Sequence, residues 1–366
     1  MRILLVSASA DYSTKDVWKG IRGGLLADGH EVIDYSLVRR LLALGEGLNV
    51  IAPAGKIADP GYVAYHASEG LAQKVILSRH RPQWLVFVSG MSLHPDALAA
   101  VRALGVKVCG IFTESPYHTA DDGELRHVPF CDVVFTNERT SVATFQAVLD
   151  RTTRGAAYYL AHAYDPDLHR PASADDPPLL EDERSDVLFI GTGWTERQAL
   201  LEAVDWAGIK LRLGGLWSGV QDISHLREHV VYPCLQNEQT VRLYRGAKIV
   251  INPHRWYEGA ESTNPRTREV AACGTFQVAD YRQEIRDEFG DAIPLFAPSV
   301  PWQLAATIRH FLANDVARAR LARAALARVQ GQTFRARAQT IIEAMLEAEQ
   351  RASRKVIALP TAAGAG

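Results

Sequence analysis

Short apolar runs alternate with amphipathic segments from the first residues of the chain onward. Residues 2–7 (RILLVS) form a mostly apolar run typical of a strand buried in a parallel sheet. Helical spacing follows over residues 15–28 and ends at Gly29, and residues 31–35 again have strand character. This strand–helix–strand order predicts the beginning of a doubly wound α/β domain.

The same alternation continues to about residue 160. Further strands are predicted at residues 84–89, 106–112, 132–136 and 156–160, and helices at 65–80, 95–104 and 139–149. Together they predict a first Rossmann-like domain over residues 1–165. The loop after its first strand, S-A-S-A-D-Y-S, lacks the G-x-G-x-x-G pattern, which argues against a nicotinamide dinucleotide site.

Residues 166–185 interrupt the pattern, because they are rich in proline and acidic residues and have no periodicity. They predict a linker. Strands and helices alternate again over residues 186–332, which predicts a second α/β domain. Residues 333–355 then have the spacing of one long charged helix, and residues 356–366 read as a flexible tail.

Composition adds little beyond this outline. The chain has 366 residues, 47% of them hydrophobic and 22% charged, with a formal net charge of −2, so its charge does not favour a nucleic-acid partner. Four scattered cysteines without metal-ligand spacing indicate a reducing compartment, and we expect a cytoplasmic protein. The given sequence starts in a predicted strand, without a charged segment before an apolar signal core, and no apolar run approaches membrane-spanning length, so we expect neither a leader sequence nor a membrane span.

Residues 249–280 bring together most of the candidate chemistry. A buried strand at 249–251 leads into a loop with two carboxylates, and Asn264 with Pro265 predicts the start of a helix that stops at Gly274. Glu261 then lies before the helix and Glu269 within it. Free backbone N–H groups at the helix start, with the charges of Arg266 and Arg268 beside them, predict an anion site. Carboxylates on either side would accept hydrogen bonds from sugar hydroxyls.

The spacing within this stretch resembles a known family. Seven residues separate Glu261 from Glu269, as in the Glu-x7-Glu element of retaining GT-B glycosyltransferases. The run N-P-R-T-R-E-V-A-A-C-G, residues 264–274, resembles the CgeB-like (spore maturation protein) branch of glycosyltransferase group one. Arg266 matches the family arginine three residues before the second glutamate. The sequence departs from the pattern at Arg268, where the family has an aromatic residue, and at Ser262 and Thr263.

This resemblance implies a GT-B fold, with two doubly wound Rossmann-like domains facing a central cleft and a C-terminal helix crossing back to the first. It also implies a glycosyltransferase that takes a UDP-, GDP-, TDP- or ADP-sugar as donor, with retention of configuration. Glu269 would hold the ribose hydroxyls and Glu261 the donor sugar. Arg266, Arg197 and the helix N-terminus would stabilise the diphosphate, so that neither a metal nor another cofactor is required.

The remaining predicted donor contacts surround the second domain's first strand and the Glu-x7-Glu segment. The run V-L-F-I-G-T-G-W-T-E-R predicts a strand, a glycine turn and a helix capped by Thr195, with Arg197 in its first turn. A tight turn with a surface arginine is an equally good interpretation of this run. The predicted donor-binding set is Gly191, Thr192, Gly193, Arg197, His254, Thr263, Asn264, Arg266 and Glu269.

In the first domain, residues 114–122 (ESPYHTADD) follow a predicted strand and resemble the Asp-x-Pro segment of CgeB-like chains. Glu114 and His118 are therefore the catalytic candidates on the acceptor side, beside Glu261 and Arg266 on the donor side. If the enzyme inverts configuration, Glu114, His118 or Asp121 would be the base. A solvated loop that only caps the next segment is the alternative.

Other functions stay open at this point. The acceptor is a small molecule, a glycan, a protein or a modified base in DNA, and only the spacing of Lys15, Lys19 and Arg22 hints at DNA. A nucleotide-sugar epimerase and a non-catalytic nucleotide-sugar-binding or assembly module on the same scaffold are rivals. His225 and His229 are four residues apart on a predicted helix, but no third ligand accompanies them, so no metal site is predicted.

Overall fold

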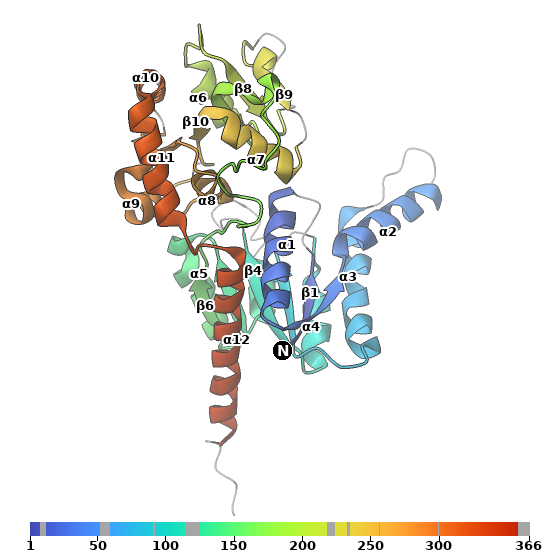
Figure 1. Ribbon diagram of the computed structural model, residues 1–366. Coiled ribbons are helices and arrows are strands. Elements are labelled where there is room, and N and C mark those ends of the chain that lie inside the picture. The colour runs from blue at the N-terminus through green and yellow to red at the C-terminus, as the bar shows by residue number, and fades with distance from the viewer. Residues whose placement is uncertain are drawn as a thin grey trace, which may run out of the picture. The chain divides into compact units, whose positions relative to one another are not determined.

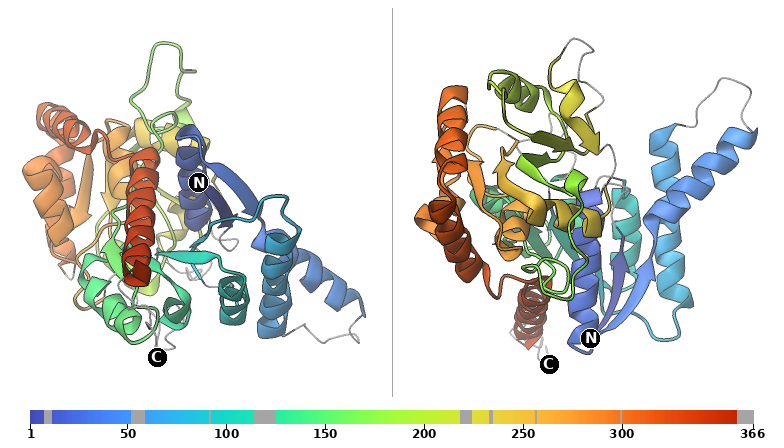
Figure 2. Two further views of the ribbon diagram at one scale, coloured as in Figure 1. Left: turned by 90° about the horizontal axis from the view of Figure 1, so that it is seen from below. Right: turned by 45° about the horizontal axis from the view of Figure 1, so that its top comes forward.

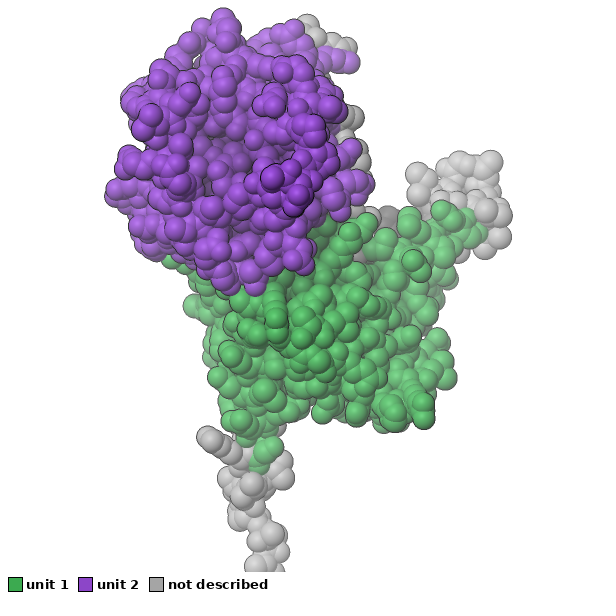
Figure 3. Space-filling view, in the orientation of Figure 1, with its two compact units in different colours: residues 1–161, 334–366 green, residues 162–333 purple. Residues whose placement is uncertain are grey.

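The computed structural model describes residues 1–7, 12–51, 59–90, 92–113, 125–217, 224–232, 235–255, 257–298 and 300–357. The chain divides into two compact units (Figure 3): unit 1 comprises residues 1–161 and 334–366, and unit 2 comprises residues 162–333. Each unit contains one six-stranded sheet in which every pairing is parallel. The fold is therefore α/β, as the alternating pattern predicts.

The sheet of unit 1 has the order β2-β1-β3-β4-β5-β6. Its strands are β1 (Arg2–Val6), β2 (Glu31–Tyr35), β3 (Trp84–Val88), β4 (Lys107–Phe112), β5 (Val133–Thr136) and β6 (Ala156–Tyr159). The flanking helices are α1 (Tyr12–Ala27), α2 (Leu37–Ile51), α3 (Pro60–Leu77), α4 (Pro95–Ala103), α5 (Val142–Arg151) and α12 (Phe334–Ile357). Every residue of β3 is buried, which explains its unbroken apolar sequence.

One helix of unit 1 was not predicted from the sequence. Helix α2 contains Gly45 and Gly47, whose low helix propensity weakens the pattern. Helix α3 also begins earlier than predicted, at Pro60, because the carboxylate of Asp59 accepts a hydrogen bond from the Tyr62 N–H (2.8 Å). The two helices lie side by side at one edge of unit 1 (Figure 2).

The C-terminal helix α12 packs along α1, so that both ends of the chain belong to unit 1 (Figure 1). Small residues on α1 permit the close approach: a Cβ added at Gly24 would lie 2.8 Å from the Cβ of Ala338 and 2.9 Å from the Cα of Arg335. Arg335 also pairs with Asp28 at 2.7 Å, and Glu349 accepts a hydrogen bond from the indole of Trp84 (2.9 Å). This is the returning helix that the GT-B resemblance implies.

The sheet of unit 2 has the order β12-β11-β10-β7-β8-β9. Its strands are β7 (Ser185–Ile190), β8 (Leu211–Gly214), β9 (Val230–Tyr232), β10 (Ala247–Asn252), β11 (Gln277–Asp280) and β12 (Leu295–Phe296). The helices are α6 (Thr195–Glu202), α7 (Asn237–Gly246), α8 (Pro265–Ala272), α9 (Gln283–Phe289), α10 (Pro301–Leu312) and α11 (Asp315–Val329). The chain runs outward from β7 and returns beside it as β10, so the strand order reverses between these two strands. Ligands of open α/β sheets bind beside the carboxyl ends of the strands at such a reversal.

The segment predicted as a linker, residues 166–185, forms part of unit 2. Asp176 pairs with Arg170 at 2.7 Å and with Arg245 of α7 at 3.3 Å. Arg242, also on α7, donates hydrogen bonds to the backbone carbonyls of Pro177 (3.2 Å) and Pro178 (2.9 Å). Two arginines of one helix thus hold this proline-rich segment against unit 2.

Two further observations concern the chain as a whole. No helix within the described ranges is both long and apolar enough to cross a membrane. Cys109, Cys131 and Cys273 are buried free thiols, whereas Cys234 lies outside the described residues.

The packing of α12 on α1 predicts opposite effects for two neighbouring glycines. Gly24→Ala forces a methyl group against the α12 backbone, and we expect the free energy of unfolding to fall by about 1–3 kcal/mol. Gly23 has no atom within 4 Å of an added Cβ, so Gly23→Ala should stabilise the helix by up to about 1 kcal/mol. Chemical denaturation of both variants measures the difference. Equal effects of the two substitutions would contradict this packing.

Candidate active site

The carboxyl end of β10 carries a buried amide at the reversal of strand order. Asn252 is fully buried, and its Oδ1 accepts hydrogen bonds from Arg266 Nη1 (2.8 Å) and Asn264 Nδ2 (2.8 Å). Its Nδ2 donates to Thr267 Oγ1 (2.9 Å) and Asn264 Oδ1 (3.2 Å). The end of the strand is thereby joined to the first turn of α8.

Helix α8 begins as predicted. Asn264 is its N-cap and accepts a hydrogen bond from the Thr267 N–H (3.2 Å), with Pro265 at the first helical position. Gly274 follows the helix with φ of +70°, a conformation that favours glycine. The predicted positions of the two carboxylates in the chain are also confirmed: Glu261 precedes α8 and Glu269 lies within it.

Arg266 extends from the start of α8 toward the glycine turn after β7. Its Cζ lies 4.8 Å from the ring centre of the buried Phe189, and a Cβ added at Gly191 would lie 2.5 Å from Arg266 Nη2. A side chain at position 191 would therefore displace the guanidinium. The Nε of Arg266 is buried and has no hydrogen-bond partner in the described part of the chain.

Arg197, on the first turn of α6, reaches the same ring. Only 7% of its surface is exposed, and its Cζ lies 5.4 Å from the Phe189 ring centre. Its Nε donates to the backbone carbonyl of Pro253 (3.1 Å) and its Nη1 to that of Thr192 (2.9 Å). A buried, oriented side chain is inconsistent with the alternative of a surface arginine beside a tight turn.

The two guanidinium groups repel each other. Burial and the positive charge of Arg266 lower the pKa of Arg197 to about 9, so that Arg197 is still protonated at neutral pH. Within the described ranges, neither arginine forms a salt bridge with a carboxylate, and the acceptors found above are uncharged. An anion between the two arginines would relieve this repulsion.

His254 is held rigidly next to these arginines. Its Nδ1 hydrogen-bonds to Asp280 Oδ1 (2.6 Å), and its backbone N–H donates to the same oxygen (2.8 Å). Burial lowers the pKa of His254, which favours the neutral ring. The carboxylate can only accept, so the proton is assigned to Nδ1, and Nε2 lies 3.4 Å from Thr267 Oγ1.

Arg268 does not contribute to the anion site, contrary to the interpretation of the sequence. Its side chain is fully buried and pairs with Glu284 (2.7 Å) and Glu288 (2.6 Å). It also donates to Thr263 Oγ1 (2.6 Å) and Gln332 Oε1 (2.6 Å). Residues two positions apart on a helix point to nearly opposite sides, which explains why Arg266 and Arg268 separate.

Thr263 is likewise engaged in structural contacts. Its N–H, predicted to be free for an anion, donates to Glu284 Oε2 (2.6 Å), and its hydroxyl accepts from Arg268. The helix start therefore offers fewer free N–H groups than predicted.

The loop that carries Glu261 is fixed at several points. Arg282 is buried and donates to the backbone carbonyls of Ala260 (3.0 Å) and Arg255 (2.7 Å). The carbonyl of Glu261 itself accepts from the Glu284 N–H (3.2 Å).

Glu269 lies on the side of α8 that faces α7, where its Oε2 is 3.5 Å from the Tyr244 hydroxyl.

The glycine turn differs from its prediction in one detail. Trp194, not Thr195, is the N-cap of α6, and it makes no side-chain capping hydrogen bond. The Gly191 N–H donates to the Gly214 carbonyl (2.8 Å) and the Gly193 N–H to that of Leu216 (2.8 Å), which ties the turn to the end of β8. Arg255 stacks on Trp194 at 4.3 Å and covers the turn from the β10 side.

A cavity of about 470 Å³ adjoins this cluster. Glu196, Arg197, His254 and Asp280 form its polar wall. The rest of the lining is apolar and consists of Ala199 and Leu200 of α6, Pro253 directly after β10, Pro298, and Pro301 at the start of α10.

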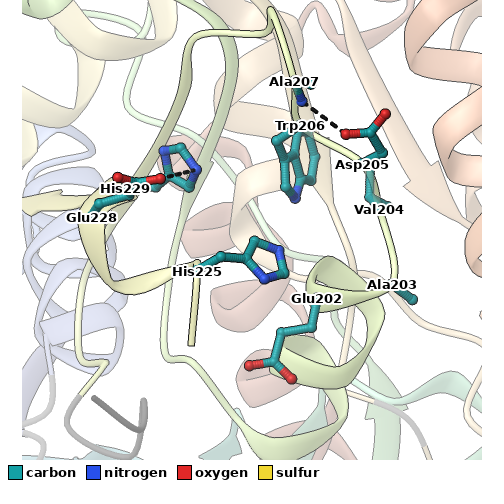
Figure 4. A pocket seen from close by; sticks show the side chains of 9 residues that line it. All are labelled: Glu202, Ala203, Val204, Asp205, Trp206, Ala207, His225, Glu228 and His229. Carbon is teal, nitrogen blue, oxygen red and sulfur yellow. Dashed lines mark hydrogen bonds and ion pairs between the residues drawn. The ribbon is translucent and has the colours of Figure 1, made fainter. Parts of the chain in front are cut away.

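A second cavity, of about 540 Å³, lies between the end of α6 and the short 3-10 helix η5 (Arg227–His229) (Figure 4). His225 and His229 both line it, but only His229 belongs to η5, so the prediction that both lie on one helix is wrong. Among the described residues, no group of three or more His, Cys, Asp or Glu side chains could hold a metal ion.

Some predicted residues lie outside the described part of the chain. Glu114, His118 and Asp121 belong to residues 114–124, which are not described. Conversely, sequence reasoning missed Asn252, Asp280 and Phe189. Asn252 and Asp280 are the final residues of β10 and β11. A polar residue at the end of an apolar run could have identified them as candidates, because ligands bind beside the carboxyl ends of such strands.

Solved structures share this architecture over nearly the whole chain. A UDP-forming trehalose-phosphate synthase from Burkholderia xenovorans has a TM-score of 0.65 at 12% identity and covers 95% of this chain and 99% of its own. Sucrose-phosphate synthase from Thermosynechococcus elongatus has a TM-score of 0.64 at 13% identity, covering 96% and 99%. HepE from Anabaena, solved in complex with UDP-glucose, has a TM-score of 0.61 at 13% identity, covering 95% and 100%.

The chain has the GT-B fold. Residues 195–343 match the model of the family described as glycosyl transferase-like, a range that contains Arg197, Glu261, Arg266 and Glu269. Spore protein CgeB of Bacillus subtilis strain 168 is 26% identical over 214 residues, 55% of this chain and 64% of that protein. The match spans less than two thirds of the relative's length. The predicted resemblance of this GT-B chain to CgeB-like glycosyltransferases is confirmed.

The contrast between the two arginines of α8 is testable by stability. Arg268→Met leaves Glu284 buried without its partner, and we expect the free energy of unfolding to fall by about 3–5 kcal/mol. Arg266→Met removes no salt bridge and should change the free energy of unfolding much less. Thermal and urea unfolding of both variants provide the measurement. Similar losses for both would contradict the structural assignment of Arg268.

Proposed function

We propose that this protein is a glycosyltransferase that moves a hexosyl or pentosyl group from a nucleotide-sugar donor to an acceptor. The match to the glycosyl transferase-like family supports this proposal, and its residues include Arg197, His254, Glu261, Arg266 and Glu269. The neighbour HepE is described in complex with UDP-glucose, which favours a nucleotide-sugar as the donor here.

One observation carries the proposal: two arginines meet at the ring of Phe189, and within the described ranges neither forms a salt bridge with a carboxylate. Holding two positive charges close together in a largely buried place, without a salt bridge to either, is unfavourable for the protein alone. The arrangement suits a group with two or more negative charges at the reversal of strand order, and a nucleoside diphosphate has that charge.

The two glutamates would take the two ends of the donor. Glu269, on the α7 side of α8, would accept hydrogen bonds from the ribose hydroxyls, and Glu261, in the loop held by Arg282, would bind the sugar. Gly191, Thr192, Gly193, His254 and Asn264 would border the diphosphate.

The proposed chemistry follows from the same charges. As the bond from the sugar to the diphosphate breaks, negative charge grows on the leaving group, and Arg197 and Arg266 stabilise it. In this scheme the arginines supply the positive charge that a divalent metal ion would otherwise supply. Retention of configuration rests on the Glu-x7-Glu resemblance, and the leaving phosphate then takes the acceptor proton. In an inverting enzyme, Glu114, His118 or Asp121 would be the base, and the acceptor would bind unit 1.

A nucleotide-sugar-binding module without turnover is the second candidate. The departures from the family pattern at Ser262 and Thr263 favour it, since Thr263 serves Arg268 and Glu284 and is not available to a ligand. Both candidates share the donor site, so binding alone does not separate them. An epimerase would differ from both by converting the donor without an acceptor.

The first experiment measures donor binding. We expect at least one of the UDP-, GDP-, TDP- and ADP-sugars to raise the melting temperature of the chain at millimolar concentration, because a ligand of the folded state stabilises it by mass action. Slow hydrolysis or transfer from the same donor would establish turnover. Binding without any turnover would favour the binding module, and no shift with any nucleotide would refute the donor site.

Substitution of the two glutamates separates their roles. Glu269→Ala should weaken nucleotide binding at least tenfold, because the ribose loses its acceptor, whereas Glu261→Ala should keep nucleotide binding and lose turnover. Calorimetric titration with the nucleoside diphosphate and a turnover assay provide the two readouts.

Glu258→Ala is the matched control, because Glu258 is an exposed carboxylate of the same loop. Unchanged binding and turnover in both glutamate variants would refute the assignment.

A further inference from the structure

Asn252 occupies a position where a side chain of the same shape could have paired with Arg266. Its Oδ1 lies 2.8 Å from Arg266 Nη1, a distance at which an aspartate would form a buried ion pair. The amide oxygen accepts the same hydrogen bond without cancelling the positive charge.

The neighbours of Asn252 determine which way the amide faces. Its Nδ2 donates to Thr267 Oγ1 (2.9 Å) and Asn264 Oδ1 (3.2 Å), so its oxygen is turned toward Arg266. A guanidinium has no acceptor, which excludes the flipped amide. The orientation of Arg266 is therefore set by the end of β10 and the cap of α8 together.

Arg197 is oriented in the same manner. Its Nε and Nη1 donate to the backbone carbonyls of Pro253 and Thr192, which carry no net charge. Pro253 directly follows Asn252 in the chain. The end of β10 thus positions both arginines with uncharged acceptors and leaves the charge of each available to a ligand.

We propose that Asn252 is a positioning residue that aims Arg266 at the diphosphate of the donor while preserving its charge. This inference rests on the proposed function and adds a specific electrostatic requirement at position 252: the acceptor there must be uncharged.

The test compares two substitutions of Asn252. The proposed positioning role predicts which of them weakens binding of the nucleoside diphosphate more. Asn252→Asp keeps the shape and the acceptor but neutralises Arg266, whereas Asn252→Leu loses the hydrogen bonds but leaves the arginine charged. We expect affinity for the selected nucleoside diphosphate to fall at least thirtyfold in Asn252→Asp and three- to tenfold in Asn252→Leu. Affinity for the matching nucleoside, which has no phosphate, should change less than threefold in both.

Gln277→Glu is the matched control for placing a carboxylate in the core. Gln277 is a buried amide on the neighbouring strand β11, and its Nε2 donates to the Thr267 carbonyl (2.8 Å). This variant should retain affinity for the nucleoside diphosphate within about threefold. If Asn252→Leu does not fold, Asn252→Ser replaces it, with the same expected range.

The outcomes distinguish the inference from the proposed function. A purely structural role for Asn252 predicts the reverse order, with Asn252→Leu more severe than Asn252→Asp, or equal losses for the nucleoside and its diphosphate. Either result would overturn the inference and leave the proposed function standing. Failure of the unsubstituted chain to bind any nucleoside diphosphate or pyrophosphate would overturn both.

Discussion

Two positive charges held against one aromatic ring are the constraint on which the candidate site depends. Arg197 and Arg266 approach Phe189 from different helices, and burial together with their mutual repulsion lowers the pKa of Arg197. The protein maintains this arrangement with rigid, uncharged acceptors at the ends of β7 and β10. The parallel sheet makes this possible, because it places β7 and β10, which are far apart in the sequence, side by side with their carboxyl ends together.

Carboxylates near the site have a different task. Glu284 and Glu288 neutralise Arg268, and Asp280 binds His254 and lies 3.4 Å from Arg282. Each of these pairs fixes a loop or a helix start around the two arginines. Arg268 is thus paired with carboxylates where the fold needs rigidity, whereas Arg197 and Arg266 have uncharged hydrogen-bond acceptors where a ligand would bring negative charge. Arg266 and Arg268, two residues apart, therefore have different roles: Arg268 stabilises the fold, whereas Arg266 would contact a ligand.

The sequence predicted local features whose causes are local. The Asn264–Pro265 start of α8, the stop at Gly274 and the alternating parallel sheets all follow from short patterns. Arg197 was predicted as a candidate, but its burial depends on contacts with the distant Pro253. Asn252 and Asp280 escaped notice because a single polar residue at the end of a strand has no pattern of its own. The helix predicted around His225 is wrong, because the structure has a 3-10 turn over residues 227–229 there. Such a turn can give histidines the same short spacing in the sequence.

The return of α12 to α1 has a consequence for the order in which the chain can fold during synthesis. Unit 2 is one continuous segment, whereas unit 1 is made of residues 1–161 and 334–366. The face of α1 that carries Gly20 and Gly24 has its partner only after Phe334 and Ala338 have left the ribosome. Helix α1 therefore packs against α12 only at the end of synthesis, and unit 2, in the middle of the chain, can complete its core before unit 1 does.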